Sequence, residues 1–205
     1  MFSAYPISFG SNIQYKDDVA EKILPSLEKY FPLKKNDVLV VDSKIISHVQ
    51  GNLIEFKNEE EKDKIIEEQA KRILRKSDSG LISETSHGFI LEDAGIIEDG
   101  NYLITLPLDV DKAANSLRLT LLNMTGFDVP IVISTNAYRP FRNFKVQIAI
   151  GISGLATESS FPDSIANLNK VLDSEMVLVR DIDKKYLGNG RAKDLITSAQ
   201  DELFS

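Results

Sequence analysis

Short apolar runs alternate along this chain with longer stretches whose apolar residues recur at helical spacing. The runs 38–41, 129–134 and 176–179 have the length of buried strands and lie between polar residues. Between them, residues 112–124 place apolar side chains three and four positions apart, as an amphipathic helix does. Because both patterns are interleaved, we predict an α/β fold of the mixed, α+β kind, with mixed β-sheets and helices packed against them.

The same criteria assign the remaining segments. Further helices are expected over 19–31, 58–76, 164–172 and 192–204, and further extended segments over 45–51, 52–56, 81–93, 102–106 and 146–154. Asn58 is a suitable cap for the second of these helices, and Asp111 for the helix over 112–124. Since no change in composition marks a linker, we expect residues 1–205 to form one domain.

Composition excludes several classes of chemistry. The absence of cysteine excludes disulfide scaffolds, thiolate zinc sites and a cysteine nucleophile. His48 and His87 are the only histidines and are 39 residues apart, so we interpret each as a polar loop or edge residue. The net charge of −7 gives no reason to expect nucleic acid as a partner. With neither a secretory signal nor an apolar run of about 18 residues, we expect a cytoplasmic protein without a membrane partner.

Three groups of polar residues are candidates for binding. Arg139 and Arg142 flank a rigid Pro-Phe pair, and such a fork can clamp a carboxylate or a phosphate; the alternative is pairing with the acidic surface. The segment 188–191 can hold a phosphate before the final helix or form an ordinary turn. Asp109 and Asp111 have the spacing of one strand face, although helix capping explains Asp111.

Several longer segments carry a resemblance to a known family. They are Asn36–Ser47, Glu84–Phe89, Asp93–Ile96, Leu106–Asp111, Ser116–Arg118, Arg139–Arg142 and Ala149–Gly154. In order and spacing they resemble the coenzyme F-420:L-glutamate ligase (gamma-glutamyl ligase) family. The similarity covers about residues 17–155 and resumes at 176–180, so the C-terminal part is shortened and divergent.

The resemblance implies a mixed α/β fold, an intertwined homodimer and a ligase that uses GTP and a divalent metal. In the family, a substrate carboxylate is activated as an acyl phosphate, which the amine of L-glutamate then attacks. Of the positions that contact the nucleotide in the family, Ser43 and Lys44 match, the next basic residue is His48 here, and an N-terminal stretch corresponds to 10–13.

The positions that bind metal in the family have changed. Ile97 stands where the family has an aspartate, Thr135 and Asn136 stand where it has Asp-Thr, and a third position falls in the shortened C-terminal segment. A hydroxyl and an amide are poor replacements for carboxylates on a hard cation. We therefore predict no metal site, unless substitute ligands come from Glu98, Asp99 or Asp111.

These departures leave three functional hypotheses. The first is a divergent homologue without the metal-dependent ligase chemistry, acting as a ligand- or protein-binding dimeric scaffold with no predicted cofactor. The second is an active ligase, requiring GTP and Mg²⁺ or Mn²⁺, that adds L-glutamate to the deazaflavin coenzyme or a folate-like acceptor. The third is a different chemistry in the same cleft, around Arg139, Arg142 and His48.

Overall fold

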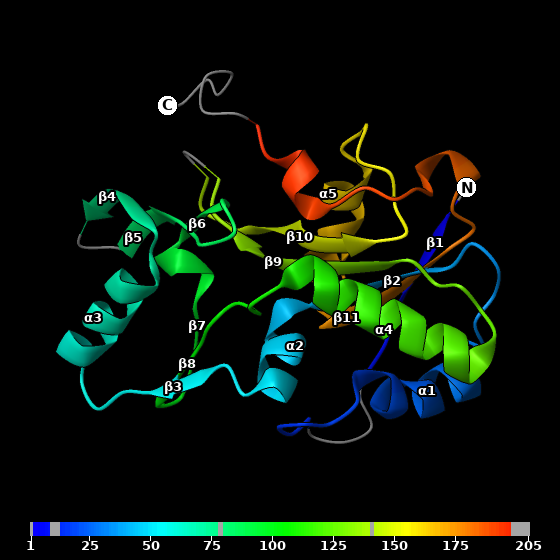
Figure 1. The fold of residues 1–205 in the computed structure, drawn as a ribbon, viewed down its shortest axis with the longest axis horizontal. Helices are drawn as coiled ribbons and strands as arrows, with labels where there is room; N and C mark the ends of the chain where they lie inside the picture. The colour runs from blue at the N-terminus through cyan, green and yellow to red at the C-terminus, as the bar shows by residue number, and fades with distance from the viewer. Residues whose placement is uncertain (1, 9–12, 78–79, 140–141, 198–205) are drawn as a thin grey trace.

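The fold is built around a five-stranded sheet with a smaller lobe beside it (Figure 1). It is seen in a computed structural model that describes residues 2–8, 13–77, 80–139 and 142–197. We call the large sheet and its helices the sheet body, and residues 53–104 the outer lobe. No helix in the described ranges has both the length and the apolar character to span a membrane. The predicted mixed α/β fold is confirmed.

The sheet body contains the predicted apolar runs as its central strands. Its order is β1 (Ser3–Pro6), β11 (Met176–Arg180), β2 (Val38–Asp42), β9 (Ile131–Ala137) and β10 (Val146–Ser153). The β2–β9 pair is parallel, and the other pairs are antiparallel. Every residue of β2 is buried, as a strand covered on both faces requires.

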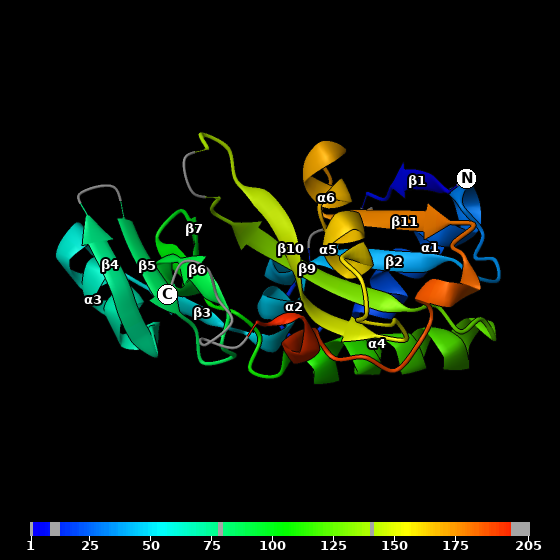
Figure 2. The same cartoon turned by 90° about the horizontal axis from the view of Figure 1, so that it is seen from above.

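Helices cover both faces of this sheet. Helices α1 (Val19–Tyr30), α2 (Ser43–Gln50) and α4 (Val110–Thr125) lie on one face, and α5 (Phe161–Ala166) and α6 (Leu168–Val171) on the other (Figure 2). The predictions of helices over 19–31 and 112–124 are thus confirmed, although Asp109 caps α4 rather than Asp111.

The outer lobe holds two small sheets and one helix. The order is β3 (Leu53–Glu55), β8 (Tyr102–Ile104) and β7 (Ile97–Asp99) in one sheet and β4 (Arg72–Ser77), β5 (Gly80–Glu84) and β6 (Ile90–Glu92) in the other. Helix α3 (Glu59–Gln69) begins at Asn58, whose side chain accepts a hydrogen bond from Glu61 N as predicted. A small core of Phe56, Ile66, Leu81 and Leu103 holds the lobe together.

Two secondary-structure predictions are wrong in this region. The segment 45–51 was expected to be extended but belongs to α2, because Asp42 caps the helix and Gly51 ends it in the left-handed conformation (φ 71°). The expected helix over 58–76 ends at Gln69, because residues 72–77 pair with β5 as strand β4.

The helical segments that the structure describes in the C-terminal part are short. The expected helix over 164–172 is the pair α5 and α6, and two 3₁₀ turns follow at Lys184–Tyr186 and Ala192–Leu195. The expected helix over 192–204 is a 3₁₀ turn over its first residues, and residues 198–204 lie outside the described part.

Candidate functional site

Ser43 and Lys44 lie where the parallel strands β2 and β9 end. They open α2 directly after Asp42, which pairs with Ser134 at the end of the β2–β9 ladder. Ser43 is buried, whereas the Lys44 side chain is 31% exposed and reaches outward to Asp99. The carboxyl ends of parallel strands next to a helix N-terminus are a common location for ligand sites in open α/β sheets.

A buried polar network supports this end of the sheet. Asp42 accepts hydrogen bonds from Lys44 N (2.9 Å) and from Gln147 Nε2 (2.7 Å). Ser134 Oγ donates to Gln147 Oε1 (2.7 Å) and accepts from Asn169 Nδ2 (3.0 Å). Burial raises the pKa of Asp42 above its usual value, against the effect of the two hydrogen bonds. The network fixes the N-terminus of α2 relative to β9, β10 and α6.

A cavity of about 260 Å³ lies between the outer lobe and the end of β9. It brings together the changed residues that can be located, since Ile97 of β7 and Thr135 and Asn136 of β9 all line it. Its charged lining residues are Lys62, Glu92, Asp93, Glu98 and Lys145. The cavity therefore contains carboxylates, but they come from residues other than the family's metal positions.

A strained turn before β7 positions Ile97 in the wall of this cavity. Asp93, Ala94 and Gly95 all have positive φ (49°, 55° and 75°). The turn is held because Asp93 Oδ1 accepts from Leu81 N (3.0 Å). Glycine suits position 95, because φ there is 75° and a Cβ would lie 2.8 Å from Leu91 Cδ1 and 2.9 Å from Leu106 Cδ1.

Lysine side chains pair with the two glutamates of the cavity, and Asp93 Oδ1 is used by Leu81 N. Lys62 Nζ lies 3.2 Å from Glu98 Oε2 and also pairs with Glu59, and these hydrogen bonds raise the pKa of Lys62. Lys145 Nζ pairs with Glu92 Oε2. Each ammonium group thus takes the charge-balancing position beside a carboxylate that a cation would otherwise occupy.

The cavity does not fit the family's divalent metal. Ile97 offers no ligand atom, and Glu92 and Glu98 are engaged by lysines. Asn136 Oδ1 is buried without a hydrogen-bond partner among the described residues. As a metal ligand this oxygen would bring no negative charge. Across the described ranges, no three Asp, Glu, His or Cys side chains gather closely enough to hold a metal ion.

The other two proposed substitute ligands are occupied elsewhere. Asp99 Oδ2 lies 3.1 Å from Lys44 Nζ and 3.9 Å from His48 Nε2. Asp111 Oδ1 accepts hydrogen bonds from Ile152 N (2.8 Å) and Ala192 N (3.1 Å). Asp111 therefore joins α4 to β10 and to the C-terminal 3₁₀ turn, which is a structural role.

The arginine fork lies apart from this cavity. Arg139 and Arg142 are both exposed beyond the end of β9, and Arg142 N donates to Arg139 O (3.2 Å). Neither residue lines the cavity beside Thr135 and Asn136. Of the stretch 10–13, residues 10–12 lie outside the described part of the chain.

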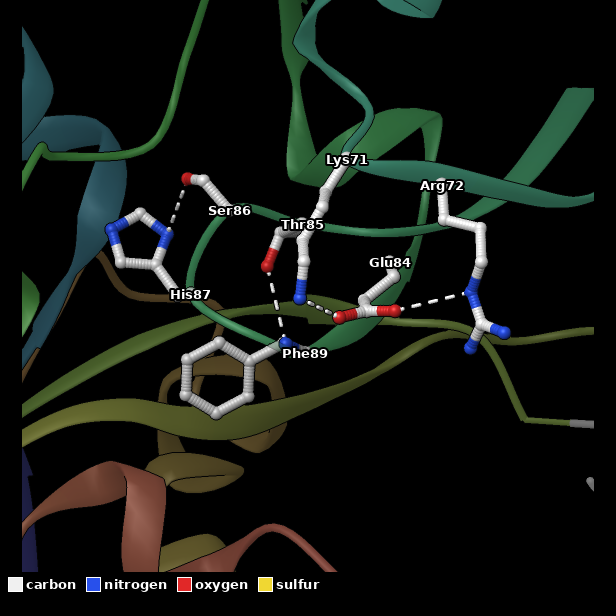
Figure 3. A network of polar contacts seen from close by, with 7 residues as sticks. All are labelled: Lys71, Arg72, Glu84, Thr85, Ser86, His87 and Phe89. Atoms are coloured by element: carbon white, nitrogen blue, oxygen red, sulfur yellow. Dashed lines mark hydrogen bonds and ion pairs between the residues drawn. The ribbon is translucent and has the colours of Figure 1, made fainter. Parts of the chain in front are cut away.

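The segment Glu84–Phe89, which contributes to the family resemblance, forms the turn between β5 and β6 (Figure 3). At its start, Glu84 pairs with Lys71 Nζ and accepts a hydrogen bond from Arg72 Nε (3.2 Å). The hydrogen bond from Lys71 holds the pKa of Glu84 below its usual value. These contacts tie the turn to β4.

The rest of this turn is held by its own polar side chains. Thr85 Oγ1 accepts from Phe89 N (3.2 Å), and the His87 and Ser86 side chains lie 3.4 Å apart (Figure 3). His87 Nε2 lies 3.1 Å from Leu108 O, which joins the turn to the segment before α4. His87 is thus placed as a structural residue of a loop, as the sequence indicated.

Sequence reasoning missed the residues that pair with the cavity's glutamates. Lys62 directly follows the acidic run Glu59–Glu61 at the start of α3, and neither Lys62 nor Lys145 belongs to a pattern that marks a site. The partners Lys62 and Glu98 are 36 residues apart, and Lys145 and Glu92 are 53 apart. Only the tertiary structure brings these charges together.

Comparison with known proteins finds similarity to coenzyme F420:L-glutamate ligases. The coenzyme F420:L-glutamate ligase of Methanocaldococcus jannaschii is 27% identical over 223 residues, covering 88% of this chain and 89% of the relative. Those of Methanopyrus kandleri and Methanothermobacter thermautotrophicus are 31% and 33% identical, covering 73% and 68% of this chain and 66% and 64% of the relatives.

The first of these alignments shows that the chain is shortened. Since 88% of 205 residues is about 180, roughly 40 of the 223 aligned positions have no counterpart here. The family model described as F420-0:Gamma-glutamyl ligase matches residues 10–197, almost the whole chain. This protein therefore belongs to the F420-0:gamma-glutamyl ligase family.

Proposed function

We propose that this protein is a divergent family member that does not carry out the metal-dependent ligase step and acts as a ligand- or protein-binding homodimeric scaffold. The observation that supports the proposal is the pairing of the cavity's two glutamates with lysines. Ile97 replaces a carboxylate, and Lys62 and Lys145 pair with the nearby Glu98 and Glu92. A Mg²⁺ or Mn²⁺ ion would have to displace two ammonium groups to reach those oxygens.

The ligand-binding part of the proposal depends on the end of the sheet that is retained. Ser43 and Lys44 match the family and stand on a helix whose N-terminus is fixed by Asp42. The end of β9 and the outer lobe enclose the cavity next to it. A scaffold with these features has a preformed cleft for a small molecule without requiring a reaction there.

An active ligase is the second candidate, and the sequence relatives favour it. The three relatives compared above are each called coenzyme F420:L-glutamate ligase, and the M. jannaschii protein aligns with 88% of this chain. On that reading GTP would be consumed as L-glutamate is added to a deazaflavin coenzyme or a folate-like acceptor. The substitute metal ligands would have to come from side chains that are now engaged by lysines, as Glu98 and Asp99 are, or by backbone N–H groups, as Asp111 is.

A turnover assay separates the two candidates. The protein is incubated with GTP, Mg²⁺ or Mn²⁺, L-glutamate and either acceptor, with the M. jannaschii relative as positive control. We expect no GDP above a blank without protein. Metal-dependent GDP release that disappears with EDTA would establish the ligase instead.

The homodimer is supported by strand β4 of the outer lobe. All six of its residues are exposed, and Ile73 and Leu74 are both 44% exposed where the pairing of β4 with β5 is interrupted by a bulge between Ile73 and Arg75. A second copy of this chain covering β4 would bury this apolar surface. Sedimentation equilibrium should give twice the mass of one chain, and an Ile73→Lys, Leu74→Lys variant should give the monomer mass. A wild-type monomer at micromolar concentration would refute the dimer.

A further inference from the structure

One contact between the outer lobe and the sheet body involves the residue that matches the family's nucleotide position. Asp99 of β7 places Oδ2 3.1 Å from Lys44 Nζ and 3.9 Å from His48 Nε2. Lys44 and His48 are four residues apart on α2 and therefore lie on one face of that helix. A carboxylate thus sits against the basic face that opens next to the end of β2.

We propose that Asp99 is an internal anion that occupies the anion-binding position formed by Lys44 and His48, so that a phosphate-bearing ligand must displace it. This inference rests on the proposed ligand-binding role of the protein. Asp99 then lowers the affinity for the ligand, because its carboxylate neutralises the charge of Lys44 until it is displaced.

The contact is suited to displacement because it is open to solvent. The side chains of Lys44, His48 and Asp99 are 31%, 28% and 50% exposed. Ion pairs with this exposure contribute little to stability, so a ligand with several negative charges can replace the single carboxylate. A phosphate also accepts more hydrogen bonds from an ammonium group than one carboxylate oxygen does.

One N–H group of the helix N-terminus is already in use. Asp42 already accepts the hydrogen bond of Lys44 N through its Oδ1. The Lys44 ammonium group is therefore the main group available to an anion at this position, with the His48 ring beside it. Asp99 is the carboxylate of the outer lobe that faces both.

Glu98 provides a matched control for Asp99. The two residues are adjacent in β7 and carry the same charge, but neighbouring strand residues point to opposite faces. Glu98 pairs with Lys62 of α3 at 3.2 Å instead of with Lys44. Replacing Glu98 by Gln therefore changes the net charge by the same amount and leaves the Lys44–Asp99 pair in place.

Isothermal titration calorimetry of the full chain tests the inference, with EDTA present so that no metal takes part. The probes are GTP and inorganic tripolyphosphate, titrated into wild type, Asp99→Asn and Glu98→Gln. We expect Asp99→Asn to bind both probes about tenfold more tightly than wild type, as removal of one close opposing charge predicts, and Glu98→Gln to change affinity less than about twofold. Tighter binding of GTP than of tripolyphosphate would identify a nucleotide as the ligand.

A second variant and the salt dependence check that the gain in affinity comes from the charge of Lys44. Adding Lys44→Met to Asp99→Asn should abolish the gain, and raising the salt from about 50 to 500 mM should reduce it. Equal affinities of Asp99→Asn and wild type, no binding by either, or an equal gain in Glu98→Gln would overturn the inference. Since binding is measured without metal, ligase turnover would refute the proposed function and leave this result standing.

Discussion

The sheet body and the outer lobe are stabilised in different ways. The body has a continuous core around β2, β9, β10 and β11, and its Arg180–Asp37 ion pair includes a fully buried carboxylate. The lobe has a core of Phe56, Ile66, Leu81 and Leu103, and its ion pairs lie at the surface. Packing therefore fixes the geometry of the body, whereas the lobe depends more on charge pairs that a ligand or partner can rearrange.

The largest expected difference comes from removing core volume in each region. Ile133 is fully buried in β9, and Ile133→Ala should lower the free energy of unfolding by about 4 kcal/mol, because the rigid sheet cannot close the cavity. Leu103→Ala in the lobe should cost about 2 kcal/mol. Urea denaturation followed by circular dichroism measures both.

Amide hydrogen exchange of Leu103→Ala tests whether the outer lobe unfolds separately from the sheet body. Leu103→Ala should speed amide exchange in β3, β7 and β8 while the amides of β2 and β9 stay protected. If Leu103→Ala speeds exchange equally in all five strands, the lobe and the body unfold as one unit, and the comparison drawn above fails.

A smaller difference is expected from breaking one ion pair in each region. Arg180 pairs with Asp37, which has no exposed surface, so Arg180→Met should cost about 3 kcal/mol by leaving a buried charge unpaired. Arg72→Met in the lobe should cost less than about 1 kcal/mol, because both partners of Glu84 are exposed.

Methionine is the suitable replacement in both cases, since it keeps most of the packing of the arginine stem. The same denaturation experiment measures both variants. Similar losses at positions 180 and 72 would show that burial does not separate the two regions electrostatically.

The smallest effects are opposite shifts of two carboxyl pKa values. Burial raises the pKa of Asp42 from 3.8, so its contribution to stability is complete below 3.8 and is lost as the pH rises through the folded-state pKa. Lys71 lowers the pKa of Glu84 from 4.5, so that contribution is present above 4.5 and is lost as the pH falls through the folded-state pKa.

Carboxyl ¹³C NMR titration checks both directions. The midpoint of Asp42 should lie above 3.8 and that of Glu84 below 4.5, and Lys71→Met should move only the second toward its usual value. An Asp42 midpoint below 3.8 would mean that its hydrogen bonds from Lys44 and Gln147 outweigh its burial.

The sequence predicted the body better than the lobe, for a physical reason. Buried strands such as 38–41 and 176–179 need apolar side chains on both faces, and that requirement is visible in one dimension. Strand β4 is exposed throughout and forms because β5 pairs with it. Residues 72–77 therefore lack the apolar pattern of a buried strand, and their basic residues resemble the last turn of a helix.

Helix α2 was predicted wrongly although its sequence contains both a capping residue and a terminating glycine. The capping Asp42 and the terminal Gly51 were both present in the sequence, but the β-branched pair Ile45 and Ile46 favoured an extended interpretation. At the site, the changed positions were found from the resemblance. The partners Lys62 and Lys145 could not be, because no local pattern relates them to Glu98 and Glu92.

The order of strands in the large sheet has a consequence for biosynthesis. Strand β2 lies between β9 and β11, whose residues are made long after it, and β1 pairs only with β11. At about 5–20 residues per second, β11 emerges on the order of 10 s after β2. Until β9 is made, the run Val38–Val41 has neither of its partner strands, and its second edge stays unpaired until β11 arrives, so this apolar run is exposed for most of synthesis.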